Sequence, residues 1–182
     1  MELNISRMAF VLARRMMSRT AASAKFKKET DRMLKAAQEL EPALAAKPVL
    51  IERIRGIEDS SRHWSLLMTL DHLVIVDRGV MAIIESLVQE KALTTKVSTA
   101  EVKPKKEQTP AVIETFRAAT QEYLDRVGAL ASLNSQTRHE HPWFGPLNAH
   151  GWHCLAAIHH GIHRRQIERI EVIAKNPDSL IL

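Results

Sequence analysis

Apolar residues recur at intervals of three and four along most of this 182-residue chain, and that period is typical of helices with one buried face. Four long helices are predicted, over residues 4–41, 60–90, 110–130 and 149–175. The polar Arg19 interrupts the stripe of the first helix and allows a break at residues 20–23, and Pro42 ends that helix. No stretch alternates apolar and polar positions over several residues, so no strand is expected.

Short polar residues mark where these helices should begin, because their side chains can accept a hydrogen bond from first-turn amides. Asn148 is the predicted cap of the fourth helix, and Asp59 or Ser60 that of the second. Thr109, followed by Pro110, has this role in the third helix. The segment before the second helix, residues 49–58, is compatible with one short helical turn.

The longest loop, residues 94–109, joins the second and third helices and carries Lys96, Lys103, Lys105 and Lys106. A connection of that length suits two helices that run parallel. An all-α, up-down-down-up four-helix bundle is therefore predicted, as a single domain over residues 1–182. The loop itself is compatible with a lid or rim of a site and equally with a solvated crossover.

Histidines are concentrated near the end of the chain, with six of the nine between residues 141 and 170. His159 and His163 are four residues apart on the apolar stripe of the predicted fourth helix, so both can reach one metal ion. His72 replaces an apolar residue in the stripe of the second helix, where an unpaired polar group costs about 1–3 kcal/mol. Three imidazoles suit zinc, nickel or iron. The alternative is a structural cluster in which each ring is paired with a carboxylate or a carbonyl.

The remaining histidines are expected away from this stripe. His153 and His160 should point elsewhere, and Asp77 should lie on the polar side of the second helix. Four histidines lie in the loop before the fourth helix or near its start. The simpler interpretation is that they are exposed, and the alternative is that they line the mouth of a site: His139, His141, His150 and His153.

Charge and cysteine content narrow the class of protein. The net formal charge is +5, and the first 28 residues hold seven basic side chains against Glu2. A solvated helix face explains that patch more simply than nucleic acid or a membrane surface, because no arginine–aromatic pattern accompanies it. The single cysteine, Cys154, excludes an internal disulfide and is interpreted as a structural thiol. With no apolar run near the roughly 20 residues of a membrane span, a cytoplasmic protein is expected.

Three pieces of the sequence resemble the DinB/YfiT-like superfamily of metalloenzymes. Leu70–Leu73 resembles its His-Leu step on helix two, and His159–Gln166 its closing HxxxHRxQ pattern. His141–Leu147, with Trp152 further on, resembles the HPxFG loop of the DUF1569-type branch. The resemblance spans roughly residues 60–174 and implies the same four-helix bundle, with a divalent metal held by the histidines at positions 72, 159 and 163.

Two functions from different classes follow from these observations. The first is a metal-dependent enzyme acting on a small molecule, either a transferase that uses a low-molecular-weight thiol or a hydrolase that uses metal-bound water. The second is a non-enzymatic stress-response or binding protein with a structural histidine cluster. A homodimer paired through exposed helix faces is expected in either case. The sequence assigns no catalytic residue beyond the metal ligands.

Overall fold

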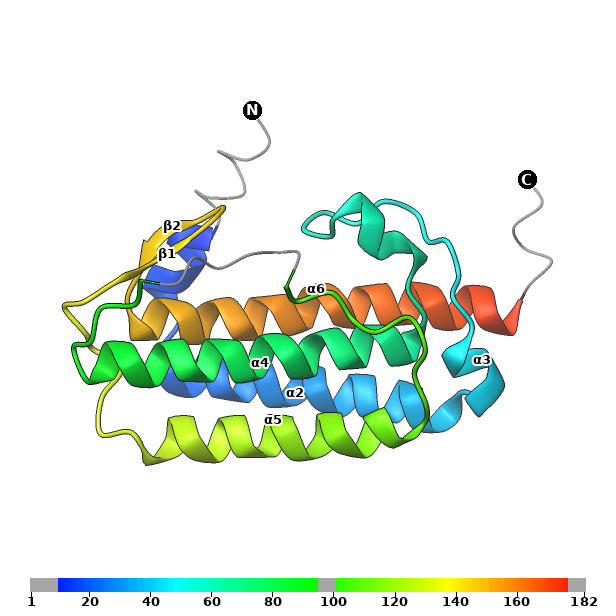
Figure 1. Ribbon diagram of the computed structural model, residues 1–182, viewed down its shortest axis with the longest axis horizontal. Coiled ribbons are helices and arrows are strands. Elements are labelled where there is room, and N and C mark those ends of the chain that lie inside the picture. Colours follow the sequence, from blue (N-terminus) through cyan, green and yellow to red (C-terminus); the bar gives the residue numbers. More distant parts are fainter. Residues whose placement is uncertain (1–9, 95–100, 177–182) are drawn as a thin grey trace.

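Four long helices form the bundle in the computed structural model, which describes residues 10–94 and 101–176. They are α2 (Arg19–Glu39), α4 (Leu66–Val88), α5 (Ala111–Ala129) and α6 (Ala149–Lys175) (Figure 1). A short helix, α3 (Pro42–Ala46), and a 3-10 helix, η1 (Asp59–His63), lie between α2 and α4. Two short strands, β1 (His139–His141) and β2 (Gly145–Leu147), precede α6.

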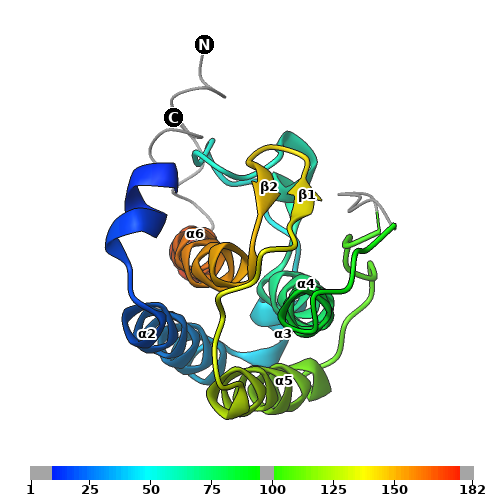
Figure 2. The same cartoon turned by 90° about the vertical axis from the view of Figure 1, so that its left-hand side faces the viewer.

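The topology is up-down-down-up, as predicted. In Figure 1, α2 and α6 run from left to right along the chain, whereas α4 and α5 run from right to left. The connection between Val88 and Ala111 is long enough for α5 to begin at the same end of the bundle as α4 and to lie parallel to it. Each helix packs on two neighbours, with α6 between α2 and α4, and α5 closing the other side (Figure 2).

A buried polar layer divides the core of the bundle into two apolar clusters. The cluster near α3 contains Met33, Leu67 and Ile167, and the cluster near the strands contains Tyr123 and Trp152. Between the two clusters, each of the four helices contributes a buried polar side chain; these are Thr30, Asp77, Thr120 and His160. A polar layer in this position must satisfy its own hydrogen bonds, because no water reaches it at these exposures.

The helix starts correct several predictions. The chain breaks at Met17 and Ser18 rather than at residues 20–23, and the Ser18 side chain caps α2. Helix α4 begins only at Leu66, where Ser65 accepts a hydrogen bond from the Met68 amide. Asp59 and Ser60 are not its caps, because they lie within η1.

Of the predictions for the later helix starts and the segment before the second helix, one is confirmed and two are wrong. Helix α5 has no side-chain cap, since the Val112 amide donates to the Thr109 carbonyl and not to its hydroxyl. Asn148 does cap α6, through a 2.9 Å hydrogen bond from the Gly151 amide. Residues 49–58 contain a turn at Gly56, which has a φ of +94°, and no helix.

The absence of strands was a wrong prediction. Strands β1 and β2 pair antiparallel with His141 opposite Gly145. Each is three residues long, too short to display an alternating pattern, and the hairpin depends on the positive φ of Gly145. Within the described residues, none of the helices combines the length and the apolar character that crossing a bilayer requires.

Candidate metal centre

His72 of α4 and the pair His159 and His163 of α6 converge at the interface of these two antiparallel helices. One ring nitrogen from each lies within 4.8 Å of the other two. The Nε2 atoms of His159 and His163 are 2.9 Å apart, and those of His72 and His159 are 3.5 Å apart. Tetrahedral zinc with bonds of roughly 2.0–2.1 Å would hold its nitrogens about 3.3–3.4 Å apart, a value that lies between these two Nε2 distances.

The tautomer of His72 is set by the loop that crosses it. Its Nδ1 lies 2.6 Å from the carbonyl oxygen of Val102. A carbonyl can only accept, so Nδ1 of His72 carries the proton. In the neutral ring the lone pair is then on Nε2, which faces the other two histidines.

Gln166 sets the tautomer of His163 in the same way. The Gln166 amide nitrogen donates to the carbonyl of Ser61 at 2.7 Å, which leaves its Oε1 to accept from His163 Nδ1, also at 2.7 Å. Gln166 is fully buried, one turn after His163 on α6. The lone pair of His163 is therefore also on Nε2, and two imidazole lone pairs are directed at one point.

His159 completes the cluster without such an anchor. Its Nδ1 is buried and has no hydrogen-bond partner among the described residues. A proton on Nδ1 would place a third lone pair on Nε2, which is the donor set of an open three-histidine metal site. A proton on Nε2 could satisfy only one of the two neighbouring lone pairs well. The residues present therefore fit a divalent transition metal.

Burial keeps the three rings in the form that a metal requires. Desolvation lowers the pKa of His72, and it lowers those of His159 and His163 to well below the usual value, with further lowering from the neighbouring rings. Neutral imidazole at pH 7 is the ligand form. Trp64 packs against the site, with its ring 4.9 Å from that of His72 and 6.3 Å from that of His163.

Part of the basic loop is fixed beside the site. The backbone amide of Lys105 and the side-chain amide of Gln108 both donate to one oxygen of Asp71, next to His72. Together with the Val102 contact, these bonds attach residues 101–108 to α4. The sequence left two interpretations open for this loop, a lid or rim of the site and a solvated crossover. The described part of the loop lies at the rim of the histidine site. Lys96 is outside the described residues.

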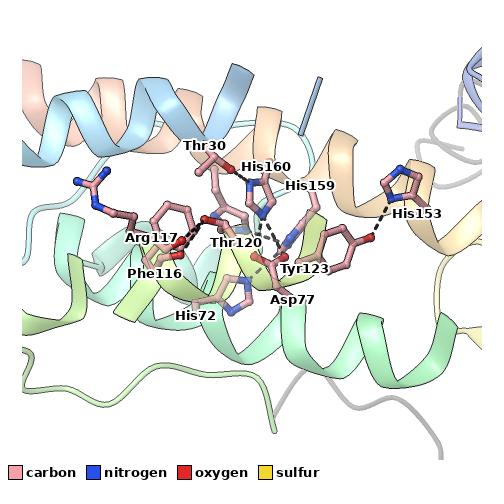
Figure 3. A network of polar contacts seen from close by, with 11 residues as sticks. Thr30, His72, Asp77, Phe116, Arg117, Thr120, Tyr123, His153, His159 and His160 are labelled. Carbon is pink, nitrogen blue, oxygen red and sulfur yellow. Dashed lines mark hydrogen bonds and ion pairs between the residues drawn. The ribbon is translucent and has the colours of Figure 1, made fainter. Parts of the chain in front are cut away.

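His160, which was expected to point away from the core, instead lies within it. Its Nε2 lies 3.0 Å from both oxygens of Asp77, and its Nδ1 lies 3.0 Å from the Thr30 hydroxyl (Figure 3). Asp77 is also buried, so its predicted place on a polar face was wrong. The pair joins α4, α6 and α2 one residue from His159 and fixes the rotation of α6 there.

His153 belongs to a second buried group at the strand end of the bundle. Tyr123 of α5 lies 3.0 Å from its Nδ1 and Ser23 of α2 lies 3.0 Å from its Nε2. The expectation of an exposed position was wrong for this residue, and also for His139, which is 7% exposed. Spacing along α6 could not reveal this, because Ser23 and Tyr123 come from other helices.

His141 and His150 are partly buried and have fixed partners. The amides of Trp143 and Phe144 both donate to His141 Nδ1, so its proton is on Nε2. Burial lowers the pKa of His141 to about 4, and its ring lies 5.4 Å from that of Trp152 on α6. His150 lies 3.0 Å from the Met17 carbonyl, in the first turn of α6 and nine residues before His159. Burial raises the pKa of the Cys154 thiol to about 11, as expected of a structural cysteine.

Comparison with known proteins supports the fold alone. No family model matches the chain, and no curated protein matches it. Among solved structures, TT2238, a four-helix bundle protein, superposes with a TM-score of 0.55 at 22% sequence identity. The match covers 83% of this chain and 98% of TT2238. It confirms the four-helix bundle and leaves membership of the DinB/YfiT-like superfamily as a prediction.

Proposed function

We propose that this protein is a metal-dependent enzyme of the DinB/YfiT-like type, with one divalent transition metal held by His72, His159 and His163. The observation that carries the proposal is the orientation of the ring nitrogens. Val102 and Gln166 each hold one ring with its lone pair toward the shared point. A structural cluster needs a donor for each of those lone pairs, and among the described residues only His159 lies within reach to supply a proton.

When bound, a metal of this class supplies Lewis-acid chemistry, which favours the anionic form of a thiol or of water at its open position. The protein's own groups do the rest. Trp64 packs against His72 and His163, and the loop attached through Asp71 forms part of the rim. Lys103 and Lys105 are candidates to attract an acidic substrate to that rim. The reaction class is thiol transfer or hydrolysis of a small molecule.

The experiment compares metal-loaded native protein with metal-free protein and with His163→Ala on a panel of electrophiles, with and without a low-molecular-weight thiol. A transferase consumes thiol in proportion to product, whereas a hydrolase forms product without it. Either activity should require metal and be lost in His163→Ala. Activity that survives in both metal-free protein and His163→Ala would contradict the proposal and favour the alternative, a binding protein with a structural histidine cluster.

A further inference from the structure

A cavity of about 230 Å³ lies at the start of α6, well away from the histidine cluster. Its lining consists of Arg14, Arg15, Arg138, Asn148 and His150. These residues come from three parts of the chain: the helical turn over residues 10–16, the segment entering β1, and the first turn of α6. His150 precedes His159 by nine residues, so the two sites are about 13–14 Å apart along the helix axis.

The three arginines of this cavity have no counter-charge in the described part of the chain. None of them forms a hydrogen bond or an ion pair with a described residue, whereas ten of the other described lysine and arginine side chains pair with a carboxylate within 4.0 Å. Guanidinium groups stay charged at all relevant pH values. Three such charges around one small cavity repel one another, and a bound anion would relieve that repulsion.

The backbone of α6 lets one of the arginines come close. A Cβ atom placed on Gly151 would lie 3.2 Å from Nη1 of Arg14, so the guanidinium lies against the helix where any other residue would crowd it. The first-turn amides of Gly151 and His150 are already bonded, to Asn148 and to the Leu133 carbonyl. Donors for a ligand must therefore come from the arginine side chains.

We infer that this arginine-lined cavity is a binding site for a phosphate group, separate from the metal centre and independent of the proposed enzymatic function. Arginine presents paired N–H donors that match phosphate oxygens, and a cavity of this size admits a phosphate or diphosphate group. The group can belong to a soluble metabolite or to a lipid headgroup. Exposed apolar side chains beside the cavity support the lipid source, because they could enter a membrane surface. Leu12 and Met16 lie on the same helical segment as Arg14 and Arg15 and are 62% and 80% exposed.

The test uses the full-length protein and pyrophosphate as probe, titrated by calorimetry at constant ionic strength, beside Arg14→Gln and Arg138→Gln. Arg78→Gln is the matched control, since Arg78 is exposed on α4 and also has no ion pair with a described residue. Each cavity variant should weaken binding about tenfold or more, the effect of losing one charge-assisted hydrogen bond, and the control should not. A parallel arm measures sedimentation with vesicles that contain phosphatidylserine.

The outcomes separate the two sources and the failure of the idea. Pyrophosphate binding that depends on Arg14 and Arg138 supports a soluble phosphate ligand. Vesicle binding that depends on the same two residues, without pyrophosphate binding, supports a lipid headgroup. No binding in either arm, or equal losses in the two cavity variants and in Arg78→Gln, overturns the inference. None of these readouts depends on metal or catalytic activity, so they do not test the metal centre.

Discussion

Replacing Gln166 by leucine should weaken metal binding without removing a metal ligand. Gln166 is 0% exposed and makes two hydrogen bonds of 2.7 Å, one from His163 Nδ1 and one to the Ser61 carbonyl. Leucine has neither donor nor acceptor, so the tautomer of His163 is no longer held. Loss of such a supporting group lowers metal affinity about 10–100-fold, or about 1.4–2.8 kcal/mol. The two groups left unpaired also lower the free energy of unfolding, by about 1–3 kcal/mol each.

A second substitution separates these two effects. In Gln166→Glu the carboxylate still accepts from His163 Nδ1 but cannot donate to Ser61, so stability should fall while zinc affinity stays near that of the native protein. Zinc affinity is measured by competition with a chromogenic chelator, and stability by urea unfolding of the metal-free forms. Gln121→Leu, at an exposed site on α5, is the control. Native zinc affinity in Gln166→Leu would refute the argument from tautomers.

Three further predictions concern the bundle around the site. Burial lowers the pKa of His153 to about 4, below its unfolded value of 6.5, so the stability contributed by the neutral ring is complete above pH 6.5 and is lost as the pH falls toward 4. The full loss of unfolding free energy is about 3 kcal/mol. Urea unfolding at pH 7 and pH 5 should therefore show a smaller change in the free energy of unfolding in His153→Gln than in the native protein. His160→Leu leaves the buried carboxylate of Asp77 unpaired and should lower the free energy of unfolding by about 3–5 kcal/mol. The double variant with Asp77→Leu should recover most of that loss. Additive losses of the two substitutions in urea unfolding would contradict this. Cys154, with a thiol pKa of about 11, is about one part in a thousand thiolate at pH 8, so it should react with a disulfide reagent far more slowly in folded than in urea-unfolded protein.

Helix periodicity was enough to predict the architecture. The apolar stripes of α4 and α6 are local patterns, and His72, His159 and His163 stand within them, so the candidate site could be assembled from spacing alone. The long connection before α5 gave the parallel pairing with α4. The break before α2 was predicted a few residues too late in the chain. The polar Arg19 shows that the apolar stripe is interrupted, but it does not show that Ser18 caps the next helix.

Interactions between helices account for what the sequence did not predict. Asp77 and His160 each look like surface positions on their own helix, and they are buried only because they face each other across the α4–α6 interface. The Val102 carbonyl that orients His72 is a backbone atom in a loop, which no residue pattern identifies. Gln166 was already on the apolar stripe of α6, one turn after the predicted ligand His163. A polar amide at that buried position was the signal in the sequence from which its hydrogen bond to His163 could have been inferred.

The most direct test of the central claim is the metal content of purified, tag-free protein, beside His72→Ala and His163→Ala, with His63→Ala as an exposed-histidine control. Elemental analysis should find close to one zinc, nickel or iron per chain in the native protein and in His63→Ala, and almost none in the other two variants. A native protein that takes up no metal even after reconstitution at neutral pH, or a His163→Ala protein that keeps full occupancy, would contradict the three-histidine metal centre.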